Sequence, residues 1–162
     1  MIDVPKLSLV AVEQCEFERV FSHYKHALYH YIDAVFGWDE HFQRKRLQES
    51  ALQGFYWVEN GDNPVGLVWF NVNKSEQHNA LHLHLLLVFS KWQNQGFGQE
   101  IINLLTSSAD QQDLKYLTLS SFIANQRAIR FYQRQGFAVV EQETHFVSMR
   151  RLLYKSLDKE KA

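Results

Sequence analysis

The chain has 162 residues, its 17 Lys and Arg nearly balance 18 Asp and Glu, and 46% of its residues are hydrophobic. These values predict one globular domain and exclude a chain that is disordered throughout. The balanced charge gives no indication of nucleic-acid binding, and the single cysteine, Cys15, excludes an internal disulfide. Met1 to Val12 does not resemble a signal peptide, and the longest apolar run, Leu85 to Phe89, is too short to span a membrane. We therefore expect a cytoplasmic protein without a membrane partner.

The first third of the chain predicts a strand, two helices and a hairpin. Residues 6–12 are short and apolar, which is typical of a strand. Apolar residues then recur at three- and four-residue steps and predict a long helix that ends at Gly37: Phe17, Val20, Phe21, Tyr24, Leu28, Tyr31, Ile32 and Val35. Asp39 can cap a second helix that runs to Gly54. The turn Asn60-Gly61-Asp62-Asn63 then joins strands 55–59 and 65–72.

The rest of the chain alternates strands and helices. Ala80 to Phe89 is almost continuously apolar, which is typical of a strand in the middle of a sheet that is covered on both faces. Helical spacing follows over 98–109 and 125–135, with a short strand at 116–119 and a final strand pair at 137–140 and 145–152. We expect a single α/β domain over residues 1–154, with helices on both faces of one sheet and a polar tail at 155–162.

The segment Gln93-Asn94-Gln95-Gly96-Phe97-Gly98 joins the long strand to a helix. Glycines let backbone N–H groups turn inward, and the first helical turn adds unpaired donors and the positive end of the helix dipole. Such a loop can bind a pyrophosphate, although two glycines also occur in ordinary turns. Gln99-Glu100 excludes a Walker loop, and Ile101 stands where a dinucleotide fingerprint needs a third glycine.

A second motif narrows the interpretation. Residues 125–137 read Asn-Gln-Arg-Ala-Ile-Arg-Phe-Tyr-Gln-Arg-Gln-Gly-Phe. This segment resembles the second signature of the GNAT family of N-acetyltransferases, in which Asn, Ala, Tyr and Gly-Phe recur at these spacings. Residues 93–98 resemble its first signature, Gln/Arg-x-x-Gly-x-Gly/Ala, although Asn94 stands where glycine is common. The resemblance is close over 80–140. It implies a mixed, mostly antiparallel central sheet of six to seven strands, with helices on both faces and strands splayed at the cofactor site.

The resemblance also implies acetyl-coenzyme A as the cosubstrate and a set of residues that bind it. Its pyrophosphate would sit on the backbone amides of the loop, which are those of Gln93, Asn94, Gln95, Gly96, Phe97 and Gly98. Its pantetheine arm would pair like an added strand beside Leu86, Leu87 and Val88. Asn125 matches the side chain that often contacts this arm, and Tyr132 matches the tyrosine that protonates the departing thiolate.

The base is harder to assign, because an alkyl amine with a pKa of about 10.4 must lose a proton before it attacks. His82 and His84 alternate on the long strand and share a face, which we expect Leu86 and Val88 to continue. His84 is the first candidate for the base and His82 the second. Two alternatives stay open: both are hydrogen-bonded sheet histidines, or ordered water is the base.

Other histidines do not predict a metal site. His23, His26 and His30 share a face of the first helix opposite its apolar stripe, so we expect them in solvent. His82 and His84 have no third ligand at a convincing spacing. We therefore expect no metal.

In the resembled family, the connection between the first two helices commonly forms one wall of the acceptor site. Here that connection is Trp38-Asp39-Glu40, in which the indole can wall an amine pocket and either acid can attract its charge. The alternative is a helix cap with an anchoring indole. Trp69 and Phe70 point to opposite faces of their strand, and one of them can line the same cleft.

The leading expectation for function is an N-acetyltransferase that acts on a primary amine of a small molecule or peptide. One alternative is a non-catalytic acyl-CoA-binding sensor or scaffold. Another is an acyltransferase with a longer acyl chain or a hydroxyl acceptor. Relatives are often homodimers, although no exposed stripe in this sequence requires one.

Overall fold

The computed structural model describes residues 7–75 and 79–153. Lys6 and the expected polar tail lie outside these ranges. The strands are β1 (Leu7–Ala11), β2 (Phe55–Asn60), β3 (Asn63–Lys74), β4 (Asn79–Val88), β5 (Tyr116–Phe122), β6 (Ala138–Gln142) and β7 (Phe146–Leu152). The α-helices are α1 (Phe17–Phe36), α2 (Glu40–Glu49), α3 (Phe97–Gln111) and α4 (Gln126–Arg134), and short 3-10 turns lie at Gln14–Glu16 and Ser90–Trp92.

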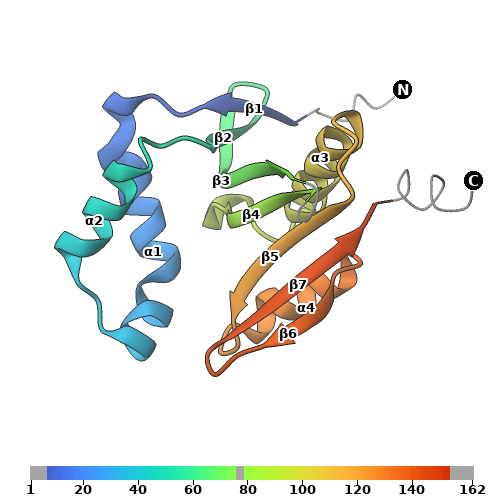
Figure 1. The fold of residues 1–162 in the computed structure, drawn as a ribbon. Helices are drawn as coiled ribbons and strands as arrows, with labels where there is room; N and C mark the ends of the chain where they lie inside the picture. Colours follow the sequence, from blue (N-terminus) through green and yellow to red (C-terminus); the bar gives the residue numbers. More distant parts are fainter. Residues whose placement is uncertain (1–6, 76–78, 154–162) are drawn as a thin grey trace, which may run out of the picture.

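All seven strands form one sheet in the order β1-β2-β3-β4-β5-β7-β6 (Figure 1). Neighbouring strands are antiparallel except for β4 and β5, which are parallel. The parallel pair follows from connectivity, because α3 crosses over between β4 and β5 and returns the chain in the same direction. The prediction of a mixed, mostly antiparallel sheet is confirmed.

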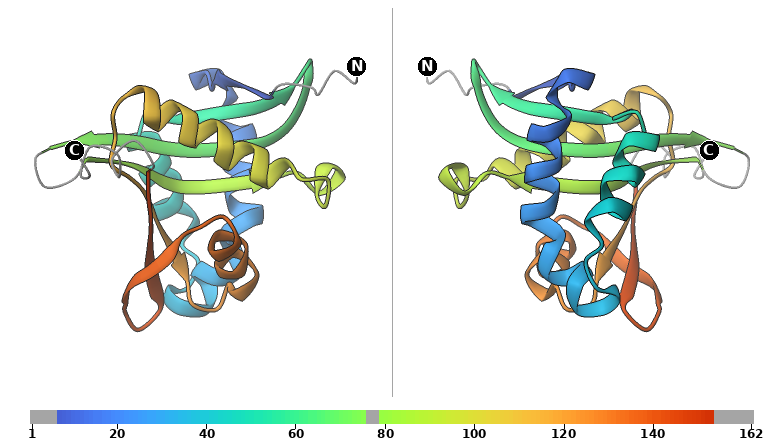
Figure 2. Two further views of the ribbon diagram at one scale, coloured as in Figure 1. Left: turned by 90° about the vertical axis from the view of Figure 1, so that its right-hand side faces the viewer. Right: turned by 90° about the vertical axis from the view of Figure 1, so that its left-hand side faces the viewer.

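Helices cover both faces of the sheet, with α3 and α4 on one face and α1 and α2 on the other (Figure 2). The α3/α4 core includes Ile101, Leu105 and Ile129, and the α1/α2 core includes Phe21 and Leu47. Fully burying an aliphatic or aromatic side chain of this kind contributes about 1.5–3 kcal/mol. The two cores therefore fix the helices on the sheet and hold its middle strands between them.

Two element ends differ from the sequence prediction by three residues or more. Helix α2 ends at Glu49 rather than near Gly54, and Ala51 and Leu52 then adopt positive φ in the turn that leads to β2. Strand β5 continues past Leu119 to Phe122, because Ser120 to Phe122 pair with β7 although two of these three residues are polar. The longer β5 matters because it forms one side of the site.

Candidate functional site

The central feature of the sheet is a gap between β4 and β5. These strands pair only where Ala80 to Leu83 meet Tyr116 to Leu119, although β4 continues to Val88 and β5 to Phe122. Beyond that point β4 stays paired with β3, and β5 stays paired with β7. Two strand edges therefore face each other without pairing with each other, as expected for splayed strands at the cofactor site.

The edge of β4 presents backbone amides to this gap. Successive residues of a strand direct their N–H groups to opposite edges. The amide of Phe89 donates to the carbonyl oxygen of Val65 beside β3, at 2.9 Å. The amides of Val88 and Leu86 therefore point into the gap. An extended ligand can pair there as an added strand.

A β-bulge at His84 interrupts β4. Trp69 pairs with Leu85 and Phe70 pairs with Leu83, so His84 has no partner residue on β3. An inserted residue reverses the alternation of side chains along a strand. Periodicity alone cannot locate such a residue, because the apolar run continues through it.

The bulge places the two histidines on a different face of the sheet from the last residues of β4. Leu83 packs in the α3/α4 core, whereas Leu85, two residues later, packs in the α1/α2 core. His82 and His84 lie on the α1/α2 side, while Leu86 and Val88 pack against the α3/α4 core. The expectation that Leu86 and Val88 continue the face of the histidines is therefore wrong.

The loop over residues 93–98 leads into α3. The N-cap residue of this helix makes no side-chain hydrogen bond to its first backbone N–H groups. Gly96 is the N-cap residue with a left-handed φ of +85°, and an added Cβ would meet nothing within 4 Å. Position 96 therefore favours glycine because of its backbone conformation and not because a side chain would lack space. The first-turn N–H groups of α3 and the positive end of its dipole are available to an anion.

Two other loop residues hold this segment in place. The side-chain amide of Gln93 donates to the carbonyl oxygen of Val88 at 2.9 Å, which ties the loop to the end of β4. An added Cβ at Gly98 would lie 3.0 Å from the Phe131 ring. The close packing of α3 on α4 therefore by itself favours glycine at position 98.

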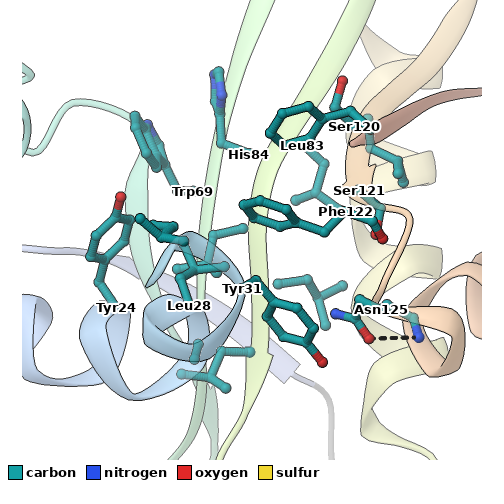
Figure 3. Close-up of a pocket in the computed structure, with 18 of the residues that line it drawn as sticks. Tyr24, Leu28, Tyr31, Trp69, Leu83, His84, Ser120, Ser121, Phe122 and Asn125 are labelled. Atoms are coloured by element: carbon teal, nitrogen blue, oxygen red, sulfur yellow. Dashed lines mark hydrogen bonds between the residues drawn. The ribbon is translucent and has the colours of Figure 1, made fainter. Parts of the chain in front are cut away.

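A cavity of about 910 Å³ extends from the gap toward α1 and α2 (Figure 3). Many of the predicted site residues line it, namely Asp39, His82, His84, Leu86, Leu87, Gln93, Asn125 and Tyr132. Val88 and the loop residues 94–98 are not among its lining. The structure therefore brings the predicted catalytic side chains and the predicted arm-binding strand to one cavity.

Asn125 and Tyr132 reach the cavity from α4 and its N-cap. The Oδ1 atom of Asn125 accepts from the amide of Ala128 at 3.2 Å, and Figure 3 shows its amide nitrogen on the cavity side. The Tyr132 ring lies 5.2 and 5.6 Å from the rings of Phe131 and Phe137, measured between centres. Burial raises the pKa of the Tyr132 phenol above its usual value, so this hydroxyl keeps its proton at neutral pH.

The two histidines are hydrogen-bonded and face the same cavity. His82 Nδ1 lies 2.8 Å from Thr118 Oγ1, and His84 Nε2 lies 2.9 Å from Asn71 Oδ1. Because an amide oxygen only accepts, the second contact places the His84 proton on Nε2 and leaves Nδ1 as the acceptor. Burial, followed by the charges of His82 and Arg46, lowers the pKa of His84 to about 4. His84 is therefore neutral at pH 7 and can accept a proton.

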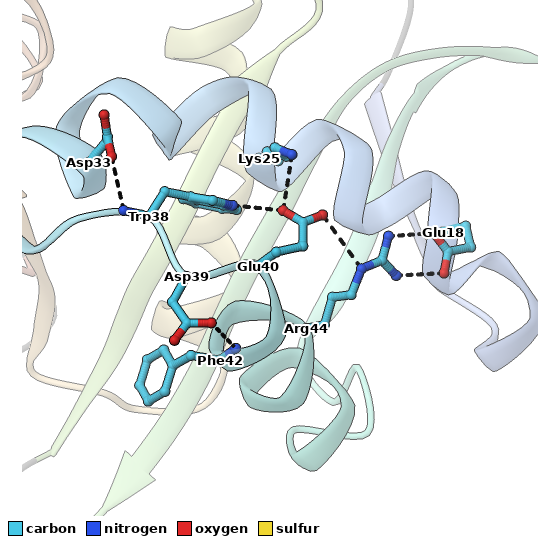
Figure 4. Close-up of polar contacts among 8 residues, drawn as sticks. All are labelled: Glu18, Lys25, Asp33, Trp38, Asp39, Glu40, Phe42 and Arg44. Atoms are coloured by element: carbon cyan, nitrogen blue, oxygen red, sulfur yellow. Dashed lines mark hydrogen bonds and ion pairs between the residues drawn. The ribbon is translucent and has the colours of Figure 1, made fainter.

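Trp38, Asp39 and Glu40 form the corner between α1 and α2 (Figure 4). Asp39 caps α2 by accepting from a backbone amide of its first turn at 3.0 Å. The indole N–H of Trp38 donates to Glu40 at 2.7 Å, and Lys25 pairs with the same carboxylate at 3.0 Å. These hydrogen bonds, first from Trp38 and then from Lys25, lower the pKa of Glu40. Asp39 lines the cavity, whereas Trp38 and Glu40 do not.

Helix α2 and its N-cap supply a wall of which the sequence analysis named only Asp39. The four residues on one stripe of its surface, at steps of three and four, line the cavity: Asp39, Phe42, Gln43 and Arg46. Gln43 is buried, and its Oε1 accepts from the hydroxyl of Tyr24 at 2.7 Å. The spacing of these four residues could have predicted a common face. The helix is mostly polar, however, so it has no apolar stripe that would indicate which face lines a cavity.

Aromatic side chains complete the enclosure. Trp69 lines the cavity between Tyr24 and His84 (Figure 3), while Phe70 packs against the α3/α4 core. Tyr31 of α1 stacks on Phe122 of β5 with ring centres 5.6 Å apart. Helix α1 therefore reaches across to the far side of the gap.

The histidine face of α1 is only partly in solvent. His23 is half-buried and stacks on Phe89 at 4.3 Å, and burial lowers its pKa, so the expectation of a fully solvated face is wrong for this residue. Within 7–75 and 79–153, no group of three or more His, Cys, Asp or Glu side chains is placed to hold a metal ion. In the same part of the chain, every helix is too short or too polar to cross a membrane.

Comparison with known proteins agrees with this geometry. The model of the acetyltransferase (GNAT) family matches residues 13–137. An uncharacterised N-acetyltransferase of Methanocaldococcus jannaschii is 26% identical over 119 residues, which are 66% of this chain and 53% of that protein. The chain thus spans about half the length of this curated relative.

Solved structures share the fold at low identity. An acetyltransferase of Thermus thermophilus has a TM-score of 0.69 and 20% identity, covering 94% of this chain and 100% of its own. The PaiA N-acetyltransferase of Thermoplasma acidophilum, solved in complex with coenzyme A, has a TM-score of 0.69 and 11% identity, covering 91% and 99%. Because the family match covers residues 13–137, which is more than half of the chain, this chain belongs to the GNAT acetyltransferase family.

Proposed function

We propose that this chain transfers the acetyl group of acetyl-CoA directly to a primary amine of a small molecule or peptide. The observation that carries the proposal is the open edge of β4, where the amides of Leu86 and Val88 point into the gap. This edge lies between the uncapped start of α3 and a cavity that Tyr132 and two histidines line. The start of α3 thus offers an anion site, the free edge of β4 offers an extended binding edge, and the adjoining cavity holds the proton-transfer groups.

Each part of the cosubstrate has a matching set of groups. The first-turn amides of α3 suit the pyrophosphate, because they need no basic side chain. Of the two free amides of β4, those of Leu86 and Val88, one suits a carbonyl oxygen of the pantetheine arm and the other suits the thioester carbonyl. Asn125 can add a side-chain donor from its Nδ2 atom, since its Oδ1 is already used as the cap of α4.

The reaction needs one proton removed and one supplied. Neutralising an alkyl ammonium at pH 7 costs roughly 4 to 5 kcal/mol, so a group must accept that proton, and His84 Nδ1 is the first candidate. The N–C bond forms as the C–S bond breaks, and the amide of Val88 can stabilise the charge that develops on the carbonyl oxygen. The Tyr132 hydroxyl then gives its proton to the leaving sulfur.

Release of free thiol from acetyl-CoA over a panel of amines and peptides tests the proposal. Tyr132→Phe should lower kcat by about 100-fold or more while leaving the Kd for coenzyme A unchanged, because only the acid is removed. Tyr56→Phe, on β2 and outside the cavity lining, is the matched control and should retain activity. An unchanged kcat in Tyr132→Phe would refute the acid role.

The panel also separates the alternative functions. Tight coenzyme A binding with no turnover of any acceptor would indicate a sensor or scaffold in place of an enzyme. Faster thiol release from longer acyl-CoA esters would indicate a different acyl group. Transfer to alcohols and not to matched amines would indicate a hydroxyl acceptor.

A further inference from the structure

Trp69 is a buried hydrogen-bond donor on the cavity wall. Its ring lies between those of Phe55 and His84, with centres 4.6 and 4.5 Å away, and the residue is 9% exposed. Among the described residues, its Nε1 atom has no hydrogen-bond partner. A buried donor without a hydrogen-bond partner lowers the stability of the folded state. Native structures therefore usually pair such a group with protein, water or ligand.

Arg46 brings a permanent positive charge to the same wall. Its guanidinium lies 5.8 Å from the centre of the Trp69 ring. Within residues 7–75 and 79–153, no carboxylate forms an ion pair with it. Arg44, two residues earlier on α2, instead pairs with Glu18 at 2.7 Å and with Glu40 at 3.5 Å, away from the cavity.

The carboxylates near this wall are already engaged. Glu40 holds Lys25, Arg44 and the Trp38 indole, and Asp39 caps α2. Asp39 is the only acid among the described lining residues, and it lies seven residues before Arg46, about 10 Å along the helix. Arg46 is therefore an exposed cation that acts on the Tyr24 hydroxyl and has no described lining acid at its own end of the cavity.

We propose that the acceptor amine carries an anionic oxygen group, a carboxylate or a phosphate, and that Arg46 binds this group. This inference rests on the proposed acetyl transfer. The guanidinium lies 5.8 Å from the centre of the Trp69 indole, whose own N–H is buried and is not assigned to the ligand. Because His84 stacks on the same indole, one small acceptor can place its anionic group at Arg46 and its amine near the candidate base. A polycationic amine would meet the positive charge of Arg46 and be disfavoured.

Matched acceptor pairs test this specificity. Phenylalanine should be acetylated with a kcat/KM about 10- to 100-fold above that of phenylalaninamide or phenethylamine, because hydrogen bonds to charged groups contribute more than neutral ones. Phosphoethanolamine against ethanolamine distinguishes a phosphate from a carboxylate, and spermidine tests the polycation. A larger preference for phosphoethanolamine over ethanolamine would identify a phosphate. A larger preference for phenylalanine over phenylalaninamide would identify a carboxylate.

Variants of α2 identify the residue responsible. Arg46→Gln should reduce the preference for the anionic member to about two-fold or less, mainly through KM. Arg44→Gln removes the same charge from the same helix outside the cavity and should keep the preference. A preference that survives Arg46→Gln would overturn the assignment, as would equal kcat/KM values for anionic and neutral acceptors in the wild type.

A binding measurement keeps this inference separate from the proposed function. If no acceptor at all is acetylated, the proposed transfer fails. Equilibrium binding of 3-phenylpropionate against 3-phenylpropanamide, to wild type and to Arg46→Gln, then decides the anion site by itself. Tighter binding of the acid that Arg46→Gln abolishes supports the site, and equal binding of acid and amide overturns it.

Discussion

Replacing His84 with glutamine removes the imidazole at the β4 bulge while keeping a side chain that can still donate to Asn71. The replacement tests whether the folded chain holds this imidazole neutral, which a proton acceptor requires. Burial and the neighbouring His82 and Arg46 lower the pKa of His84 from 6.5 to about 4. Any acid limb of kcat/KM that comes from His84 should therefore lie near pH 4 and not near pH 6.5.

The size of the effect follows from the pKa difference. Between about pH 6.5 and pH 4, the unfolded chain binds a proton at His84 and the folded chain does not, so the free energy of unfolding falls as the pH falls. The full shift corresponds to about 3 kcal/mol. His84 is exposed, and solvent screening reduces this value to about 1 to 2 kcal/mol. This contribution is fully present above pH 6.5 and is lost as the pH falls through about 4.

Urea unfolding of the wild type and of His84→Gln at about pH 7.5 and about pH 4.5 measures the difference. The wild type should lose about 1 to 2 kcal/mol more stability than the variant over this interval. His41→Gln removes an exposed imidazole of α2 and serves as the control. Equal losses in wild type and His84→Gln would refute the depressed pKa of His84.

Three further experiments use five substitutions, and the first two separate stability from ligand binding. Gly96→Ala and Gly61→Ala both place alanine at positive φ in open space and should each cost about 1 to 2 kcal/mol in thermal unfolding, but only Gly96→Ala should also weaken coenzyme A binding. Asn125→Ala and Asp39→Ala each remove a helix cap worth about 1 kcal/mol, and steady-state kinetics should show a raised KM for acetyl-CoA only in Asn125→Ala. Leu47→Ala, at a fully buried position, should lower the free energy of unfolding by about 2 to 5 kcal/mol in a urea titration, and an intact midpoint would contradict the packing of α2.

Elements with a strong local signal were predicted well. The three- and four-residue apolar steps of α1 end at Gly37, and the structure ends this helix at Phe36. Asp39 caps α2 as expected, because an N-cap depends on one side chain and the next helical turn. The ends of α2 and β5 were missed because they depend on a left-handed turn at Ala51 and Leu52 and on pairing of Ser120 to Phe122 with β7.

The cavity depends on contacts between residues far apart in the chain. Arg46 and Trp69 carry no motif, and they meet only because α2 packs over the same sheet face that the indole reaches. The choice between Trp69 and Phe70 as a lining residue was likewise decided by the register of β3, which places the indole on the α1/α2 side.

The order of elements and the two motifs at residues 93–98 and 125–137, and through them the family, can be read from the amino-acid sequence. These features are local, because caps, helical periods and glycine conformations depend on residues a few positions apart. The direction of the β4 side chains depends on the folded sheet, since one unpaired residue at His84 reverses their alternation and its place is set by the facing strand. Long-range packing of the same kind, and no local pattern, brings Arg46 to the cavity.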